Sequence, residues 1–476
     1  MRVEVTKAWL ETPEKICLEW STDFDDSDVF KSRLLTITYD EEVPLNAGLA
    51  TFIFINTILA CYSKYYKREV IDYVLPAELS YSVETSIKQY HNIEFSSECS
   101  KVLSIEEKLA TTDIEYENAL FYGGGKDSLV SALIQKELYG ASNIVLLRLV
   151  WDTDVNNLPI KRSIIEKPLN YMREIGIESK LIESNFHNII TNRHIGKLPN
   201  LALYPGLMMP ILSKLNVKRV VNGYDPGLFH LPVLNKAGEK KLMPFSTARP
   251  EQLKILAESI EGMLKQKIYF RNYNYAINEN IAFELLSKAF QEHWANIYMC
   301  ERLVGKWCLK CRKCFLYAIA CLAFEMESDF NLGYFFQTSK YIQDLVYELK
   351  SLDIESYSQP PYFDKFSAPT HFCVTIRLVN YINLDYAKSK IDHEKYNEAY
   401  NNFLDIIKTY KKDLFTDYDY FWMAAYEYDL LTSEDPNLKS ERLKMLELLD
   451  NSRVGISYKR KFLGLNRDRD VLYDYS

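Results

Sequence analysis

The segment Ala119-Leu-Phe-Tyr-Gly-Gly-Gly-Lys-Asp-Ser-Leu-Val130 joins a short apolar run, three glycines and the start of an amphipathic stretch. The apolar run predicts a strand, and Val130, Leu133 and Leu138 then recur at helical spacing. Gly140 supplies a C-terminal stop for that helix. A strand, a glycine turn and a helix in this order predict the first unit of an α/β domain with a parallel sheet.

Strand and helix patterns continue to alternate downstream of this segment. Such alternation implies crossover connections, so we expect a parallel sheet with flanking helices, followed by a mainly helical stretch over residues 250–330. The expected elements are strands at Ile144–Val150, Ser179–Ile182 and Val217–Val221, and helices at Ser163–Ile175 and Leu203–Leu215.

The two ends of the chain show different secondary-structure patterns from this central part. The front portion predicts strands near Val3 and Val5, at Ile16–Trp20 and at Leu34–Tyr39, then helices at Asn46–Tyr66 and Pro76–Tyr90. The end of the chain is acidic, rich in Tyr and patterned for helices at Asp392–Tyr410 and Tyr418–Leu431. We therefore expect an N-terminal α+β domain over 1–112, the parallel-sheet domain over 113–330 and a helical C-terminal region over 331–476.

Composition excludes several classes of protein. The chain has 476 residues, 47% of them hydrophobic and 26% charged, as globular proteins do. The net charge of −8 argues against a broad surface for nucleic acid. The apolar run Ala47–Cys61 is shorter than the ~20 residues of a membrane helix, and the N-terminus lacks a signal-peptide pattern. We expect a cytoplasmic protein without membrane association, and so no disulfide framework among its nine Cys.

The glycine loop has the chemistry of a phosphate site. Gly123, Gly124 and Gly125 let backbone N–H groups approach an anion, and the helix that follows adds its dipole. Lys126 offers a positive charge and Ser128 a further hydrogen bond. The adjacent Asp127 is expected to cap the helix or to engage a magnesium ion. The spacing is neither that of a Walker loop nor that of the dinucleotide fingerprint. A tight turn with an Asp cap is the structural alternative.

The stretch Phe121–Val130 resembles the Ser-Gly-Gly-x-Asp-Ser loop of the PP-loop ATP pyrophosphatases. Gly124, Gly125, Asp127 and Ser128 match that pattern, whereas Gly123 stands where the family has its first Ser. The resemblance implies an adenine nucleotide α-hydrolase-like fold and cleavage of ATP between its α- and β-phosphates. It also implies transfer of AMP to a substrate oxygen, pyrophosphate on the loop and a requirement for Mg²⁺.

Further ATP contacts follow from the same resemblance. The end of the second strand, with Leu149, Val150 and Asp152, corresponds to the place where this family's backbone meets adenine. Residues 199–208 resemble the loop and helix after the third strand. Asp152 and Asp225 are the preferred contacts to magnesium or ribose, with loops before buried helices as the alternative. The fourth strand and its active-site loop are expected to contribute Asn222, Gly223 and Asp225.

Four cysteines form the second motif, Cys300-x7-Cys308-x2-Cys311-x2-Cys314. Four thiolates suit a tetrahedral structural Zn²⁺ ion, and the basic residues in this stretch would offset their charge. An iron–sulfur cluster and a group of buried thiols are the alternatives. Cys321 is expected to belong to the core.

The cysteine motif narrows the resemblance. One Cys before three closely spaced ones resembles the 7-cyano-7-deazaguanine synthase (QueC-like) branch. The sequence of Trp307–Tyr317 and the Gly-Gly-Gly-Lys-Asp-Ser motif resemble the muramyl-peptide L-glutamate epimerase (MurL-like) family more closely still. Members of that family are thought to adenylate the terminal glutamate of UDP-N-acetylmuramoyl-L-alanyl-L-glutamate and to invert its α-carbon. The resemblance covers residues 45–330.

The residues leave the second step of the reaction open. An adenylated carboxylate has a more acidic α-proton and can also be attacked by an amine, so epimerisation, amidation and ligation all remain. His187, His194 and His230 are candidate bases, and Arg193 and Lys197 are candidate contacts for an acidic substrate. We expect a small-molecule or peptide substrate with a carboxylate. The alternatives are a QueC-like enzyme that acts on a deazaguanine or a conjugate, and a non-catalytic nucleotide-binding module whose helical C-terminus binds a protein partner.

Overall fold

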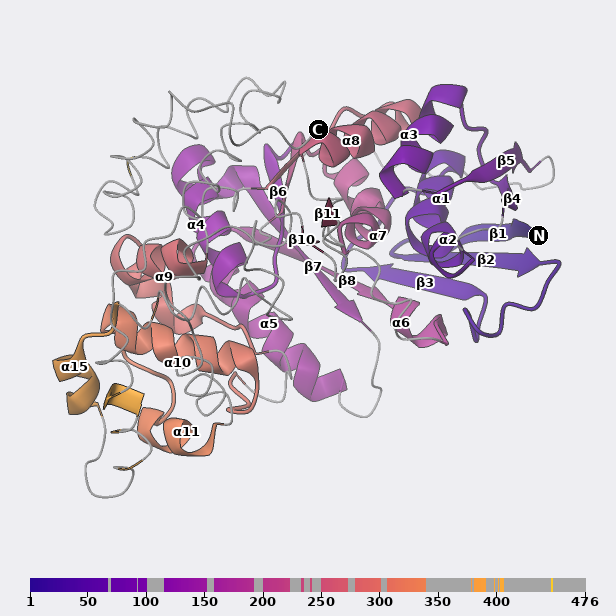
Figure 1. The fold of residues 1–476 in the computed structure, drawn as a ribbon. Helices are drawn as coiled ribbons and strands as arrows, with labels where there is room; N and C mark the ends of the chain where they lie inside the picture. Colours follow the sequence, from indigo (N-terminus) through magenta and orange to yellow (C-terminus); the bar gives the residue numbers. More distant parts are fainter. Residues whose placement is uncertain are drawn as a thin grey trace.

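A sheet of ten strands runs through the part of the chain that the computed structural model describes, with helices on both of its faces (Figure 1). The strand order is β12-β9-β6-β7-β8-β3-β2-β1-β4-β5. The structure describes residues 1–66, 70–91, 93–100, 115–151, 158–191, 200–222, 233–234, 240–241, 250–272, 279–300, 306–339, 378, 381–390, 398, 401, 403–405 and 447.

Five neighbouring strands form an all-parallel half of this sheet. Read across the sheet from β8, their order is β8-β7-β6-β9-β12. Numbered by their place in the chain, this is the order 3-2-1-4-5 that is typical of doubly wound α/β folds. The α/β class, the four predicted strands and the mainly helical character of 250–330 are confirmed. The strand β12 within that stretch was not predicted, because four residues are too few to show a strand pattern. The strands are β8 (Glu178–Ser184), β7 (Ile144–Trp151), β6 (Asn118–Phe121), β9 (Arg219–Asn222) and β12 (Tyr269–Asn272).

Alternating residues of each parallel strand supply two hydrophobic cores, one on each face of the sheet. On β7, Leu146 and Val150 belong to one core, whereas Val145 and Leu147 belong to the other. The first face is covered by α4 (Lys126–Tyr139) and α5 (Leu158–Glu174). The second is covered by α7 (Asn200–Lys214) and α8 (Pro250–Leu264). Figure 1 shows these two pairs of helices on opposite sides of the sheet.

The N-terminal portion continues the same sheet, because β3 pairs with β8 in antiparallel orientation. The predicted boundary near residue 112 lies outside the described residues, so the division into domains stays a prediction. The strands of this portion are β1 (Arg2–Thr12), β2 (Lys15–Thr22), β3 (Leu34–Tyr39), β4 (Ile71–Leu75) and β5 (Phe95–Cys99), and β4 and β5 were not predicted.

Helices of the N-terminal portion pack against α7 and α8. The predicted helix at Asn46–Tyr66 is confirmed as α1 (Ala47–Phe54), a π-helical turn η1 (Ile55–Leu59) and α2 (Ala60–Tyr65). The predicted helix at 76–90 begins only at α3 (Tyr81–His91). The prediction placed its start too early because Ser80 forms the cap: its hydroxyl accepts a hydrogen bond from the Val83 N–H.

The remaining described elements extend the core next to α4. They include η6 (Gln291–Asn296), α9 (Glu279–Lys288), α10 (Arg312–Phe324), α11 (Leu332–Thr338) and α15 (Leu384–Ser389). The shorter pieces are η2 (Ala141–Asn143), α6 (Phe186–Ile189), β10 (Val233–Leu234) and β11 (Lys240–Lys241). The helix predicted at Tyr418–Leu431 and most of the one at Asp392–Tyr410 lie outside the described residues. Among the described helices, none has the length and apolar character needed to cross a membrane.

Candidate functional site

The glycine loop lies where the direction of the chain connections reverses. It follows β6, whose neighbours are β7 on one side and β9 on the other. The helices after β6 and β7 cover one face of the sheet, and those before and after β9 cover the other. Doubly wound sheets bind ligands beyond the carboxyl ends of the strands at this switch point. The loop at 123–125 is therefore in the position where such a fold offers a binding crevice.

The loop backbone takes a shape that requires glycine. Gly124 has φ +74°, in the left-handed region, and a Cβ there would lie 3.1 Å from Cγ of Pro168 on α5. Gly125 is the N-cap of α4, and no side chain caps this helix end. Of the two roles expected for Asp127, the cap is not seen among the described residues, where its carboxylate pairs with Lys126. The N-cap residue itself offers no side-chain acceptor to the first turn of α4, and a helix N-terminus of this kind can bind an anion.

Ser128 holds the loop closed. Its Oγ accepts a hydrogen bond from the Gly123 N–H at 3.2 Å and donates to the Gly125 carbonyl at 3.1 Å. The side chain is only 8% exposed. The hydroxyl that the sequence assigns to a phosphate contact thus also organises the turn itself.

Lys126 and Asp127 neutralise each other. Nζ of Lys126 lies 2.7 Å from Oδ2 of Asp127 and 5.5 Å from the centre of the Phe283 ring on α9. The lysine side chain is 1% exposed and the aspartate side chain 21%. The loop therefore carries a closed ion pair instead of a free cation and a free carboxylate.

Sequence reasoning missed Arg148, which lies beside this loop. Its Nη1 donates a hydrogen bond to the carbonyl of Tyr122 at 3.2 Å. The signal was present in the sequence, because Arg148 is the single charged residue inside the apolar strand Ile144–Val150. Burial lowers the pKa of this guanidinium.

An aromatic group marks the carboxyl end of β7. The imidazole of His187 on α6 stacks on Trp151 with ring centres 4.1 Å apart, and Tyr204 of α7 stacks on the indole at 6.4 Å. Burial lowers the pKa of His187, so its ring is neutral at neutral pH. Among the predicted bases, His187 is the one within the described residues, and it lies at the same edge of the sheet as the glycine loop.

The other predicted contacts are placed only in part. Leu149 and Val150 are buried near the end of β7. Asn222 ends β9, where its backbone is in register with Asn272 of β12. The predicted residues that lie outside the described part of the chain are Asp152, Arg193, His194, Lys197, Gly223, Asp225 and His230.

The four predicted cysteines converge on one point. Their sulfur atoms all lie within 4.8 Å of one another, with Cys311 and Cys314 at 3.5 Å and Cys308 and Cys314 at 3.9 Å. Zn–S bonds of about 2.3 Å in a tetrahedron place sulfur atoms about 3.8 Å apart. The group could therefore hold a metal ion such as zinc. The fold brings Cys300 beside the other three cysteines although it lies further away in the sequence.

The surroundings of the cluster suit thiolate ligands. Cys311 is the N-cap of α10, so Cys314 lies in the first turn, where the helix dipole favours negative charge. The backbone N–H of Lys310 points at Sγ of Cys308, 3.4 Å away. The contact with Cys311 and burial raise the pKa of the Cys314 thiol. A bound metal ion supplies the positive charge that deprotonates such thiols. Lys306, expected to offset thiolate charge, instead pairs with Asp329 at 2.7 Å.

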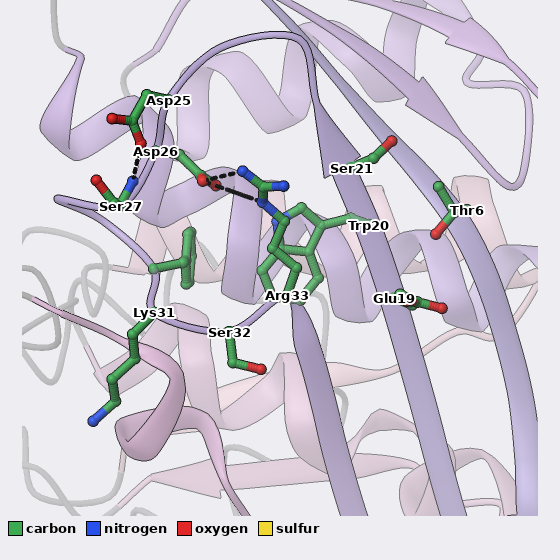
Figure 2. Close-up of a pocket in the computed structure, with 11 residues that line it drawn as sticks. Thr6, Glu19, Trp20, Ser21, Asp25, Asp26, Ser27, Lys31, Ser32 and Arg33 are labelled. Atoms are coloured by element: carbon green, nitrogen blue, oxygen red, sulfur yellow. Dashed lines mark hydrogen bonds and ion pairs between the residues drawn. The ribbon is translucent and has the colours of Figure 1, made fainter.

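A hollow of about 730 Å³ lies on the N-terminal portion of the sheet (Figure 2). Two of the charged residues that line it, Asp26 and Arg33, form an ion pair. Asp26 accepts a hydrogen bond from Nε of Arg33 at 3.1 Å and another from the hydroxyl of Tyr62. The indole N–H of Trp20 donates to the same hydroxyl at 2.9 Å. These contacts tie the 23–33 loop to α2, so we assign this hollow a structural role.

Comparison of the chain with protein-family models, with curated proteins and with solved structures gives no match.

Proposed function

We propose that the protein is an ATP-dependent enzyme that adenylates a carboxylate or carbonyl oxygen and releases pyrophosphate. The observation that carries the proposal is the N-terminus of α4, which begins at a glycine N-cap behind a glycine turn, at the switch point of a parallel sheet. This geometry suits a polyphosphate, and the likeness of 121–130 to the PP-loop pattern selects ATP from the ligands that contain one.

In the proposed reaction an oxygen of the substrate attacks the α-phosphorus of ATP. The bond between the α- and β-phosphates breaks, pyrophosphate leaves with the bonding electron pair, and AMP becomes attached to the substrate. The loop 123–128 would hold the pyrophosphate, and the end of β7 would face the adenine. Mg²⁺ would accompany the nucleotide, with Asp127 as the nearest carboxylate of the loop.

Epimerisation is the second step that we favour. Adenylation removes the negative charge of a carboxylate and so acidifies the neighbouring α-proton. Neutral His187 could accept that proton, because burial keeps its ring uncharged and Trp151 holds it by stacking. A proton delivered from solvent to the opposite face of the planar intermediate would invert the centre, and attack of water on the acyl carbon would then release AMP and the inverted acid. Amidation or ligation, as in a QueC-like enzyme, uses the same adenylate with a nitrogen nucleophile.

A nucleotide-binding module without turnover is the second candidate. Two observations favour it: Gly123 lacks the hydroxyl of the family pattern, and Lys126 is occupied by Asp127. Such a module would bind ATP and release it unchanged.

One assay separates the two candidates. The protein is incubated with Mg²⁺, ATP labelled at the α-phosphate and a panel of carboxylic acids, among them glutamyl peptides, and labelled AMP is measured. AMP formation that is abolished in Asp127→Asn, and unchanged in Asp385→Asn of the distant α15, supports the enzyme. ATP binding without AMP from any acid supports the module. Deuterium uptake from D₂O at the substrate α-carbon then identifies epimerisation, and a new amide without uptake excludes it.

A further inference from the structure

Arg148 is a cation placed inside an apolar strand. Alternation along β7 puts it on the same face as Leu146 and Val150, the face that α4 and α5 cover. The other described residues of this strand between Ile144 and Val150 are apolar and buried. Burying part of a guanidinium costs free energy unless its donors and its charge are compensated.

The compensation that the described chain offers Arg148 is incomplete. Nη1 donates to the Tyr122 carbonyl, but Nε is inaccessible to solvent and has no hydrogen-bond partner among the described residues. Within the same residues no carboxylate forms an ion pair with this guanidinium. By contrast Arg219, on β9 at the other side of β6, pairs with Glu117 at 2.9 Å.

Nη1 of Arg148 is the part of the guanidinium that lies beside the glycine loop. A Cβ added at Gly123 would lie 3.4 Å from Nη1 of Arg148 and 3.8 Å from Oγ of Ser128. Because Gly123 has no side chain, the guanidinium can lie directly against the backbone of the loop. Gly123 stands where the PP-loop pattern has its first Ser, and in this chain Arg148 lies beside that position.

A second unsatisfied donor lies at the same place. Tyr122 directly precedes the loop, is 2% exposed, and its hydroxyl has no partner among the described residues. Burial raises the pKa of Tyr122, so the hydroxyl stays protonated and can donate. The charge of Arg148 reaches this phenol, which places the two groups in one neighbourhood.

We propose that Arg148, assisted by the hydroxyl of Tyr122, binds phosphoryl oxygens of a diphosphate group held on the glycine loop. Lys126 and Asp127 cancel each other, so the loop needs another cation for a ligand with several negative charges. A guanidinium with free donors is the side chain best suited to phosphate. The inference rests on the proposed function for its ligand, ATP, and covers inorganic pyrophosphate through the same chemistry.

The test measures binding of inorganic pyrophosphate, ATP and AMP by calorimetry, each with Mg²⁺. Arg148→Gln keeps an N–H for the Tyr122 carbonyl and removes the charge, so we expect affinity for pyrophosphate and ATP to fall at least about tenfold, with AMP affected much less. Arg148→Lys should recover part of the loss. Arg162→Gln on the exposed side of α5 is the matched control and should bind as the wild type does.

Stability separates a ligand-binding arginine from a structural one. Because its charge is uncompensated, Arg148→Gln should leave the melting temperature of the ligand-free protein unchanged or raised. Tyr122→Phe removes a buried hydroxyl without a partner, so it should also keep stability and weaken pyrophosphate binding severalfold. Lower melting temperatures with unchanged pyrophosphate affinity would assign both residues to packing and overturn the proposal.

The outcomes for the two proposals are distinct. Pyrophosphate binding that Arg148→Gln weakens, in a protein that forms no AMP, supports the role of Arg148 and refutes the enzyme. AMP formation with equal pyrophosphate affinity in wild type and Arg148→Gln refutes the role of Arg148 alone. Failure of the wild type to bind either pyrophosphate or ATP refutes both.

Discussion

The backbone N–H of Tyr298 donates a hydrogen bond to the carbonyl of Gly124 at 2.8 Å. The next two residues continue this link: Met299 lies against Gly125, and Cys300 is the first member of the cysteine cluster. Lys306, just before Cys308, lies over the Tyr298 ring at 5.1 Å. The segment that carries the cluster therefore also supports the glycine loop from one side, while Pro168 supports it from the other.

Removal of metal from the cluster should consequently weaken ligand binding at the loop. Cys311→Ser should lose bound zinc, and the loosened Tyr298 segment should lower pyrophosphate affinity by about 1.4 kcal/mol, or tenfold, the size of one good hydrogen bond. Metal analysis and calorimetry measure the two effects. Cys321→Ser is the control, because this buried thiol lies on α10 outside the cluster. Unchanged affinity in a zinc-free protein would show that the cluster and the loop are independent.

Gly124 and Gly125 of the loop should differ sharply in their tolerance of a side chain. Gly124→Ala forces a left-handed backbone on alanine and presses its Cβ against Pro168, so we expect a loss of about 1–2 kcal/mol of unfolding free energy. Gly125→Ala should cost less than about 1 kcal/mol, because Gly125 has φ −77° and its nearest neighbour would be 3.9 Å away. Urea unfolding of both variants measures the difference, and equal losses would contradict the loop geometry.

Much of the parallel half was predictable because its signals are local. The apolar run, the glycines and the helical spacing of 119–140 each report on a few neighbouring residues, and all agree with the structure. The convergence of Cys308, Cys311 and Cys314 follows from short spacing, which limits where the chain can go. The arrangement of the site was only partly predictable, because it depends on side-chain conformations that the sequence does not report. The sequence Lys126-Asp127 alone does not indicate that the two charges will pair.

Long-range pairing was the other gap. The sequence patterns indicate the strands of the N-terminal portion and those of the parallel half one by one, and none of them indicates that β3 pairs with β8. Register between strands that are distant in sequence depends on packing that no local pattern reports. Arg148 belongs to the same class, since its relation to Gly123 exists only once β6 and β7 are paired.

The junction between β3 and β8 makes a prediction of its own. Asn185 follows β8 and extends the ladder with its side chain, which accepts from the Thr36 N–H at 2.8 Å and donates to the Leu34 carbonyl at 3.0 Å. Asn185→Ala should therefore lower the unfolding free energy by about 1–2 kcal/mol. Asn188→Ala is the control, because that side chain makes no hydrogen bond with the described residues. Equal urea midpoints for the two variants would show that the junction does not depend on Asn185.

The stacking of His187 on Trp151 sets the expected pH dependence. Burial lowers the pKa of His187, so the folded state favours the neutral ring. The stability that this contributes is complete above the unfolded value of about 6.5 and is lost as the pH falls through the lower folded value. NMR titration should show a midpoint for His187 below 6.5, and Trp151→Ala should raise it by opening the ring to water. His91, whose pKa burial lowers to about 4, is far from Trp151 along the sheet and is the internal control. If His187 titrates at its ordinary value in the wild type, its ring is open to water, which contradicts its burial against Trp151.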